Sequence, residues 1–214
     1  MSSLLTEALS LCNLAAVGIF GIVLSAAFCE IEWTRCHKLL LVGSTILMLA
    51  LQGVVSLRWG TGLARYLYPL ITHLPLWLLL AAMTRHALWP LVSVLTAYLC
   101  CQLRRWAALL VIALFPAGGT PLQDATELIV TLPILLVLIR WIAPSVRALS
   151  RSPLLLQLQF GMIPLLSYLF DYFTRIYTDL LSSGNQAAVE FMPFVCSLAY
   201  LIFVLHTTQE QQLR

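Results

Sequence analysis

The sequence predicts an all-α protein, a polytopic bundle of transmembrane helices, from its composition and from the length of its apolar runs. Of its 214 residues, 61% are hydrophobic and only 10% are charged, and the mean hydropathy is +0.93. A soluble domain carries about a quarter charged residues, so this chain cannot cover a globule with polar surface and needs lipid as its solvent. The apolar runs are continuous and do not alternate at period two, which favours helices over a transmembrane barrel.

About eight helical spans are expected, because a helix needs roughly 20 apolar residues to cross the hydrocarbon core. In chain order they are residues 8–28, 39–57, 66–83, 87–103, 106–116, 127–143, 154–170 and 191–205. The fifth run is short, and if it does not cross the membrane, seven spans result. Pro75 lies inside the third span, where its missing N–H frees a carbonyl and predicts a kink.

Charged, glycine-containing or proline-containing segments separate these spans. They are the charged loop 29–38, the glycine-containing loop 58–65, the turn 84–86, the arginine pair 104–105, the loop 116–121, the basic loop 145–152 and the break at 182–185. No internal repeat and no segment with the composition of a soluble domain is found in the sequence.

The orientation of the chain follows from its basic residues, which favour cytoplasmic loops. With eight spans and both ends in the cytoplasm, the inside collects the larger set, Arg58, Arg65, Arg104, Arg105, Arg140, Arg147, Arg151 and Arg214. The outside then holds Arg35, Lys38, Arg85 and Arg175. With seven spans the early helices invert, whereas the last three keep their orientation. The sequence therefore predicts a multi-pass protein of the cell membrane, with the segment 171–190 outside and the C-terminal tail inside.

Charged residues in the last third of the chain are the first candidates for a site that binds a ligand or signal. Asp171, Arg175 and Asp179 recur every four residues and so lie on one side of the predicted helix. Ionisable groups at membrane depth are costly and usually functional, which suggests an outward-facing signal site. Its wall would be made by Tyr168, Tyr172 and Tyr177. The alternative is that the helix leaves the bilayer here, where tyrosine is common and an Asp–Arg pair needs no ligand.

Glu190 and His73 complete the candidate set. Glu190 opens the last helix, where a carboxylate suits the positive end of the helix dipole; it is either a cap or a partner for Arg175 across the loop. His73 lies in an apolar run two residues before Pro75. It is either hydrogen-bonded to a neighbouring helix or a group that senses protons or a ligand.

Other polar residues in the spans are given structural roles. Asn13 and Gln52 are expected to form hydrogen bonds between helices. Glu127 follows Asp124 at the outer start of its span and is expected to mark the membrane surface.

No catalytic motif, metal site or cofactor site is found in the sequence. It contains no HExxH, no GxSxG, no glycine-rich phosphate loop and no Cys-x-x-Cys pair. The net charge of +3 fits loop arginines better than nucleic-acid binding. Activity as an enzyme is left open, since the absence of known motifs lowers that expectation without removing it.

The last two predicted spans resemble those of a known family. The segments concerned are 168–174 (YLFDYFT), 177–181 (YTDLL), 183–185 (SGN) and 189–194 (VEFMPF). They look like the last two membrane helices of sensor histidine kinases of Gram-positive anaerobes that carry a C-terminal ATPase domain of the GHKL type. These kinases are similar in layout to the peptide quorum-sensing receptor kinases. The likeness is specific over residues 157–205 and looser elsewhere.

The resemblance implies the sensor half of a two-component kinase, because the helix with the phosphoacceptor His and the ATPase do not occur in this chain. Residues 1–206 would be the transmembrane sensor domain. Residues 207–214, which are helix formers without a stop signal, would begin a cytoplasmic signalling helix. The implied partners are the lipid bilayer, a second copy of the chain, a cytoplasmic kinase domain and a response regulator, without nucleic acid and without a cofactor.

Two alternatives come from other classes of protein. The first is the membrane substrate-binding subunit of a small-molecule transporter, since such subunits are compact helix bundles of similar size. The second is a structural or scaffold membrane protein, in which replacement of the charged residues near position 175 would have no specific effect.

Overall fold

The computed structural model describes the backbone of residues 2–113, 120–176 and 186–213, and the side chains of residues 8–60, 63–64, 66–113, 122–172 and 193–210. All regular structure within these ranges is helical, which confirms the all-α class. The elements are α1 (Ser2–Phe28), α2 (Arg35–Tyr68), η1 (Pro69–His73), α3 (Leu74–Thr84), α4 (Leu88–Ala113), α5 (Thr120–Val137), η2 (Leu138–Ile142), α6 (Ala143–Leu149), α7 (Leu154–Ile176) and α8 (Gln186–Leu213). The elements η1 and η2 are π-helical turns.

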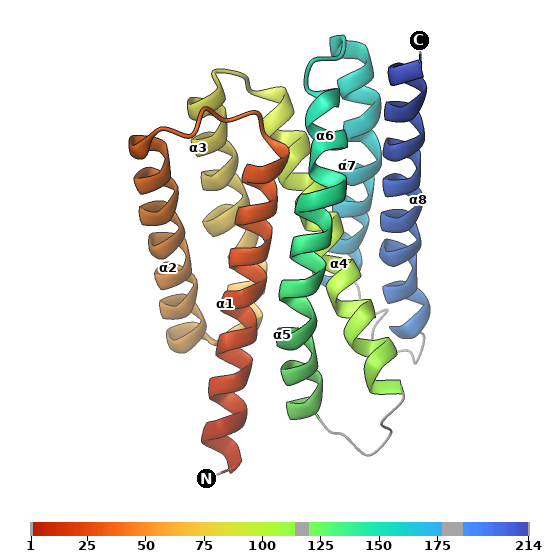
Figure 1. Ribbon diagram of the computed structural model, residues 1–214. Helices are drawn as coiled ribbons and strands as arrows, with labels where there is room; N and C mark the ends of the chain where they lie inside the picture. The colour runs from red at the N-terminus through yellow and green to blue at the C-terminus, as the bar shows by residue number, and fades with distance from the viewer. Residues whose placement is uncertain (1, 114–119, 177–185, 214) are drawn as a thin grey trace.

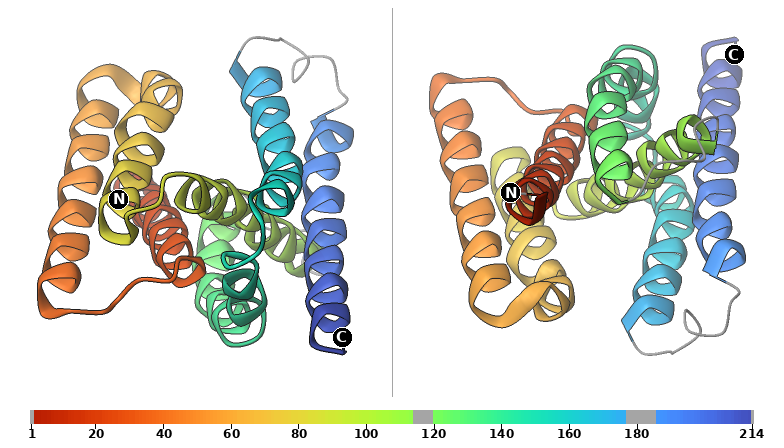
Figure 2. Two further views of the ribbon diagram at one scale, coloured as in Figure 1. Left: turned by 90° about the horizontal axis from the view of Figure 1, so that it is seen from above. Right: turned by 90° about the horizontal axis from the view of Figure 1, so that it is seen from below.

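Helix α4 runs obliquely through the middle of the bundle, and the other helices pack around it (Figure 1). Its most extensive contacts are with α1, α5 and α7, and it also packs against α3 and α8. Seen along the bundle, α2 and α3 lie on one side of α4, and α7 and α8 lie on the other (Figure 2). Helix α4 is therefore the element through which the two sides of the bundle are connected.

Six described stretches are long and apolar enough to cross a membrane. They are Ala8–Phe28, Arg35–Gly60, Tyr66–Thr84, Leu88–Ala113, Leu122–Leu149 and Leu154–Tyr172. Helix α8, which carries the last predicted span, lies along the bundle beside α7 (Figure 1). The described residues thus contain six to seven helices apolar enough to span a membrane, fewer than the eight expected and in line with the seven-span alternative, because residues 106–113 continue α4 instead of forming a fifth span. The run contains no glycine or proline, and the charges of Arg104 and Arg105 do not end the helix.

The buried core forms two clusters, one on each side of α1. The larger cluster joins α1, α4, α6, α7 and α8, and its bulkiest members are Phe20, Phe28, Trp89, Phe160 and Tyr200. The smaller cluster joins α1, α2, α3 and α4 through residues such as Ile22, Met48, Leu76, Leu80 and Val94. In the larger cluster the Trp89 indole N–H donates a hydrogen bond of 3.1 Å to the carbonyl of Phe28. This bond ties the start of α4 to the end of α1.

The outer surface of the bundle is also apolar. Large side chains such as Leu39, Leu57, Ile129 and Trp141 have 74%, 76%, 73% and 72% of their surface exposed. A soluble monomer rarely exposes large contiguous apolar patches. These long apolar helices and their exposed side chains are compatible with a membrane protein.

The turn between the second and third crossings lies within α2, at Gly60. Its φ of +87° and ψ of 162° belong to a region that is essentially restricted to glycine. Past this point the chain reverses direction (Figure 1). Gly43 lies on the same helix with regular helical backbone, and a Cβ added there meets nothing within 4 Å.

The two glycines therefore predict opposite effects of the same substitution. Gly60→Ala is expected to lower the free energy of unfolding by about 1–3 kcal/mol, because a Cβ is strained at this φ and ψ. Gly43→Ala serves as the control and is expected to be neutral or to raise stability by up to about 1 kcal/mol, since alanine favours a helix over glycine. Denaturant unfolding of both variants in the same micelles measures this, and equal losses would contradict the assignment of the turn to Gly60.

An ion pair joins the loop after α1 to the loop before α7. The Nε of Arg151 donates a hydrogen bond of 3.2 Å to Oε2 of Glu30, and a second guanidinium nitrogen bonds to Oε1. The hydrogen bond from Arg151 is the main cause that lowers the pKa of Glu30 from its ordinary value of 4.5. Both side chains are exposed, so the pair is screened by salt.

The lowered pKa predicts a loss of stability in acid. A carboxyl group whose pKa is lower in the folded state contributes stability above its ordinary pKa, and this contribution disappears as the pH falls through the folded value. The melting temperature of the wild type should therefore exceed that of Glu30→Gln at neutral pH, and the difference should vanish below the pKa of Glu30. Thermal unfolding at low salt checks this, and a difference that persists at the acid end would show that the ion pair is not its source.

Candidate functional site

The π-helical turn η1 places Tyr68 and His73 on the same side of the third crossing. In a regular α-helix, residues five apart diverge by about 140° around the axis, whereas a π-turn closes hydrogen bonds five residues apart. Here the N–H of Leu74 bonds to the carbonyl of Pro69. The Tyr68 and His73 rings meet edge to face, with centroids 4.9 Å apart. Pro69 and Pro75 lack the N–H groups that a regular helix would use at these positions, which accounts for the irregularity.

Three tyrosines from three segments surround His73. The centroid of its ring is 5.3 Å from that of Tyr98 on α4 and 5.4 Å from that of Tyr168 on α7, again edge to face. Its Nδ1 lies 3.1 Å from the Tyr168 hydroxyl, and the imidazole tautomer determines which atom donates. The hydrogen bond to a neighbouring helix, one of the two alternatives for His73, is therefore present.

The carboxylate of Asp171 faces the interior from α7. The residue is only 3% exposed, and Oδ2 accepts hydrogen bonds from the hydroxyl of Tyr98 and, at 3.4 Å, from Nε2 of Gln102. Tyr98 thus contacts His73 with its ring and Asp171 with its hydroxyl. We call His73, Tyr98, Gln102, Tyr168 and Asp171 the α4–α7 cluster.

Tyr172 extends the α4–α7 cluster toward α2. Its hydroxyl donates a hydrogen bond of 2.8 Å to the carbonyl of Tyr66. Its ring stacks on that of Tyr168, with an interplanar angle of 7° and centroids 6.1 Å apart. The tyrosines of α7 therefore contact η1 and α4 through Tyr168 and the end of α2 through Tyr172.

A second polar cluster lies around Arg104, where α1, α4 and α5 meet. Nη2 of Arg104 is 2.8 Å from Oε2 of Glu127, and both side chains are buried. Nη1 donates to Oδ1 of Asn13 at 2.7 Å and to the hydroxyl of Thr131 at 3.2 Å. The amide nitrogen of Asn13 donates to Glu127 at 3.0 Å and to Asp124 at 2.9 Å. Three helices are thus joined by one network of charge-assisted hydrogen bonds.

This network confirms one prediction and corrects one. Asn13 bonds between helices as expected. The carboxylate of Glu127 points into the bundle and neutralises Arg104, a pairing that the sequence did not predict. Arg104 does not end its helix, because this neutralisation lets a charge lie within α4.

Removal of one charge from this pair is expected to be costly. Glu127→Gln leaves the Arg104 charge buried without its counterion and should lower the free energy of unfolding by about 3–5 kcal/mol. The double variant Arg104→Met with Glu127→Leu should recover most of this loss, since it removes both charges. Arg140→Gln, at an exposed arginine, is the control and should stay within about 0.5 kcal/mol. Unfolding of these three variants and of the single variants Arg104→Met and Glu127→Leu in one bilayer system measures the coupling, and additive losses in the double variant would refute it.

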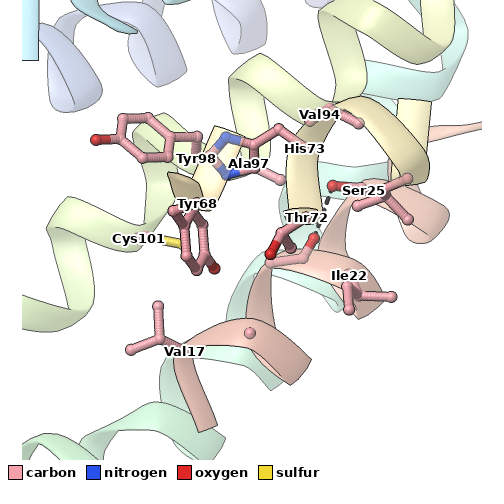
Figure 3. A pocket seen from close by; sticks show the side chains of 13 residues that line it. Val17, Ile22, Ser25, Tyr68, Thr72, His73, Val94, Ala97, Tyr98 and Cys101 are labelled. Carbon is pink, nitrogen blue, oxygen red and sulfur yellow. Dashed lines mark hydrogen bonds between the residues drawn. The ribbon is translucent and has the colours of Figure 1, made fainter. Parts of the chain in front are cut away.

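A cavity of about 70 Å³ lies between α1, η1 and α4, beside the α4–α7 cluster. Most of its wall is apolar and is formed by Val17, Ile22, Leu76, Val94 and Ala97. The side chains of Tyr68 and Thr72 point into the hollow from the opposite wall, and Val17 lies across from them (Figure 3). His73 and Tyr98 belong to both the cavity wall and the α4–α7 cluster.

Helix α4 also connects the cluster to α8. The hydroxyls of Thr96 and Tyr200 are 3.3 Å apart. The hydroxyl of Ser197 shares its proton between the carbonyl of Leu99 on α4, at 2.8 Å, and that of Pro193 on its own helix, at 2.7 Å. Thr96, Ser197 and Tyr200 are fully buried. Tyr98 lies between Thr96 and Leu99 in the chain, so the same two turns of α4 carry contacts to both the cluster and α8.

The structure brings together about half of the residues proposed from the sequence. Those in contact are His73, Tyr168, Asp171 and Tyr172. Tyr177 and Asp179 lie outside the described residues. Arg175 and Glu190 lie on α7 and α8, and their side chains are outside the described set.

The sequence interpretation missed the residues of α4. Tyr98 and Gln102 are four residues apart and so face the same side of the helix, and Arg104 lies two residues further on. Polar residues at this spacing in an apolar run indicate a polar face on the helix. The sequence interpretation missed this face because it ended the fourth predicted span at residue 103.

Within the described part of the chain, no group of three or more His, Cys, Asp and Glu side chains is placed to hold a metal ion. No protein-family model, curated protein or solved structure matches the chain. The fold and the site together define a helical bundle, compatible with a membrane protein, that has polar clusters buried between its helices.

Proposed function

We propose that this chain is the sensor and signal-transmission module of a two-component histidine kinase of the GHKL type, located in the cell membrane. The α4–α7 cluster would receive an extracytoplasmic or membrane signal, and α8 would pass it to a cytoplasmic kinase core. The observation that carries this proposal is the pair of buried hydrogen bonds from α4 to Ser197 and Tyr200 of α8. Through these bonds the helix that forms the cluster also holds α8, the helix that would carry the output.

The form of α8 supports a role in output. The helix is continuous from Gln186 to Leu213 and therefore passes from the apolar run into the polar residues 207–213 without a break. Tyr200, Val204 and Thr208 recur every four residues and are buried against the bundle. A helix packed in this way moves as a rigid element, so that a shift or rotation at one end reaches the other.

The distribution of charge supports an orientation with the end of α8 in the cytoplasm. The end of the bundle at which α8 finishes also carries the loops after α1, α3 and α6 (Figure 1). These loops and the helix ends beside them carry Arg35, Lys38, Arg85, Arg147 and Arg151. Basic residues favour the cytoplasmic side. With seven crossings, the N-terminus would then be outside.

The resemblance of residues 157–205 to sensor kinases supplies the partners in this proposal. Such kinases act as dimers, so the chain would work as a homodimer that controls a kinase domain and, through it, a response regulator. Arg175 near the end of α7, Glu190 near the start of α8 and Asp179 in the segment between them would then face the outside and contribute to the signal site.

A second candidate function is the membrane substrate-binding subunit of a small-molecule transporter. The cavity beside His73, which lies between helices in the interior of the bundle, favours this candidate. The α4–α8 hydrogen bonds favour the sensor, because they connect the α4–α7 cluster to the helix that would carry the output.

A fusion protein tests the sensor proposal. The whole chain is joined after Arg214 to the dimerising helix and ATPase of a well-characterised histidine kinase, with zero to seven alanines inserted at the junction. Autophosphorylation in membrane vesicles should vary with the insert and repeat about every 3.6 residues, because each residue rotates the kinase relative to α8. Ser197→Ala should change the basal activity of the best fusion about fivefold, because it removes a buried hydrogen bond of about 1 kcal/mol.

The control is Ser44→Ala, which removes a hydroxyl from α2 that bonds only to its own helix at Leu40 and Leu41. This variant should leave kinase activity unchanged. Activity that does not depend on the insert and is the same in both serine variants would reject the sensor proposal. Uptake of a small molecule by vesicles that contain the chain would instead support the transport subunit.

A further inference from the structure

We infer that the cavity between α1, η1 and α4 is a binding site for a small neutral molecule with one hydroxyl or carbonyl group on a short carbon chain. The strongest indication is the hydroxyl of Thr72, which lines the cavity. Thr72 is only 3% exposed, and its Oγ1 has no hydrogen-bond partner in the described part of the chain. A buried hydroxyl without a partner costs free energy, so a ligand that supplies the missing bond is stabilised there.

The other helical threonines show why Thr72 is unusual. A threonine in a helix commonly bonds to the carbonyl four residues earlier. Thr45, Thr84 and Thr126 do so with distances of 2.7, 2.8 and 2.7 Å. At Thr72 the wider π-helical turn changes the position of the hydroxyl relative to that carbonyl. The hydroxyl points into the cavity, as the Tyr68 side chain does (Figure 3).

The rest of the wall determines the chemistry of the ligand. The lining contains no Asp, Glu, Lys or Arg, so a bound ion would lack a counter-charge. A fully apolar molecule would leave the Thr72 hydroxyl unpaired. The side chains of Val17, Ile22 and Leu76 provide an apolar surface for a carbon chain. The matching ligand is therefore neutral and has one polar end.

The volume of the cavity limits the size of the ligand. An apolar cavity of about 150 Å³ accepts benzene. The cavity here measures about 70 Å³, so its ligand is smaller than benzene. Val17 and Tyr68 are half-buried, so the edge of the cavity reaches the outside of the bundle between α1 and η1. A molecule dissolved in the bilayer could enter there.

Binding at this site does not depend on the proposed function, but its role as a signal rests on it. The cavity shares His73 and Tyr98 with the α4–α7 cluster. An occupant that pushes against α4 would therefore displace Tyr98 and, through α4, the groups bonded to α8.

The test uses the full chain in lipid nanodiscs with ¹³C-labelled methyl groups, titrated with n-alkanols from ethanol to hexanol. The methyl signals of Val17 and Ile22 should shift in a saturable way. Affinity should rise about fourfold for each added methylene and then stop rising when the cavity is full. Partitioning into the bilayer continues to rise with chain length, so the point at which affinity stops rising distinguishes the cavity from lipid.

Two variants isolate the role of the hydroxyl. Thr72→Val keeps the shape of the side chain and should weaken binding about fivefold, because the ligand loses its hydrogen-bond partner. Ser93→Ala is the matched control, since Ser93 also carries a fully buried hydroxyl but does not line the cavity. It should leave affinity unchanged. Three results would overturn the assignment. The first is the absence of a saturable shift, which is expected if the cavity holds only water. The others are an affinity that rises with chain length without a limit, and a Thr72→Val variant that binds alkanols as tightly as the wild type.

The kinase fusion separates this inference from the proposed function. In one outcome, alkanols bind in a saturable way, but they do not change the kinase activity of the fusion, and that activity does not depend on the junction. This outcome would support the binding site and reject the sensor. Activity that depends on the junction, without alkanol binding, would keep the sensor and reject the binding site.

Discussion

The arrangement of this bundle depends on the neutralisation of one buried guanidinium group. Arg104 lies within α4 and is only 4% exposed, where an isolated charge would be very unfavourable. Glu127 provides the opposite charge from α5, and Asn13 bonds to both groups from α1. The pairing fixes the rotation of α4 about its axis, because the guanidinium group must face α1 and α5. It therefore also fixes which residues of α4 face α7 and α8.

Composition and the length of apolar runs were sufficient to predict the helical class and most of the long apolar helices, because lipid permits few architectures. The predicted number of spans was too high because of residues 104–113, since an arginine at the end of an apolar run is compatible with two structures. It ends a span if it faces water, and it continues one if a carboxylate neutralises it. Glu127 is 23 residues away from Arg104, so no local pattern distinguishes these cases.

The candidate site was predictable in part for the same reason. The cost of polar groups in apolar runs was sufficient to select His73 and Asp171 as candidates. Their partners could not be predicted, because Tyr168 and Tyr98 are separated from them by 95 and 73 residues. The sequence placed Asp171 on one side of its helix, but it did not indicate that this side faces α4. Helical spacing identifies which residues share a face, but the direction of that face depends on packing between helices.

The π-helical turn η1 also limits how the gene for this protein can change in length. A π-turn is equivalent to an α-helix with one extra residue, so the deletion of one codon within 69–73 would restore regular helix. The segments on either side would then rotate by about 100° relative to each other. Either Leu76 and Leu80 would leave the core or Tyr68 would leave the cavity. Many substitutions on the lipid-facing side of this crossing preserve the fold, but the number of residues in the turn is fixed.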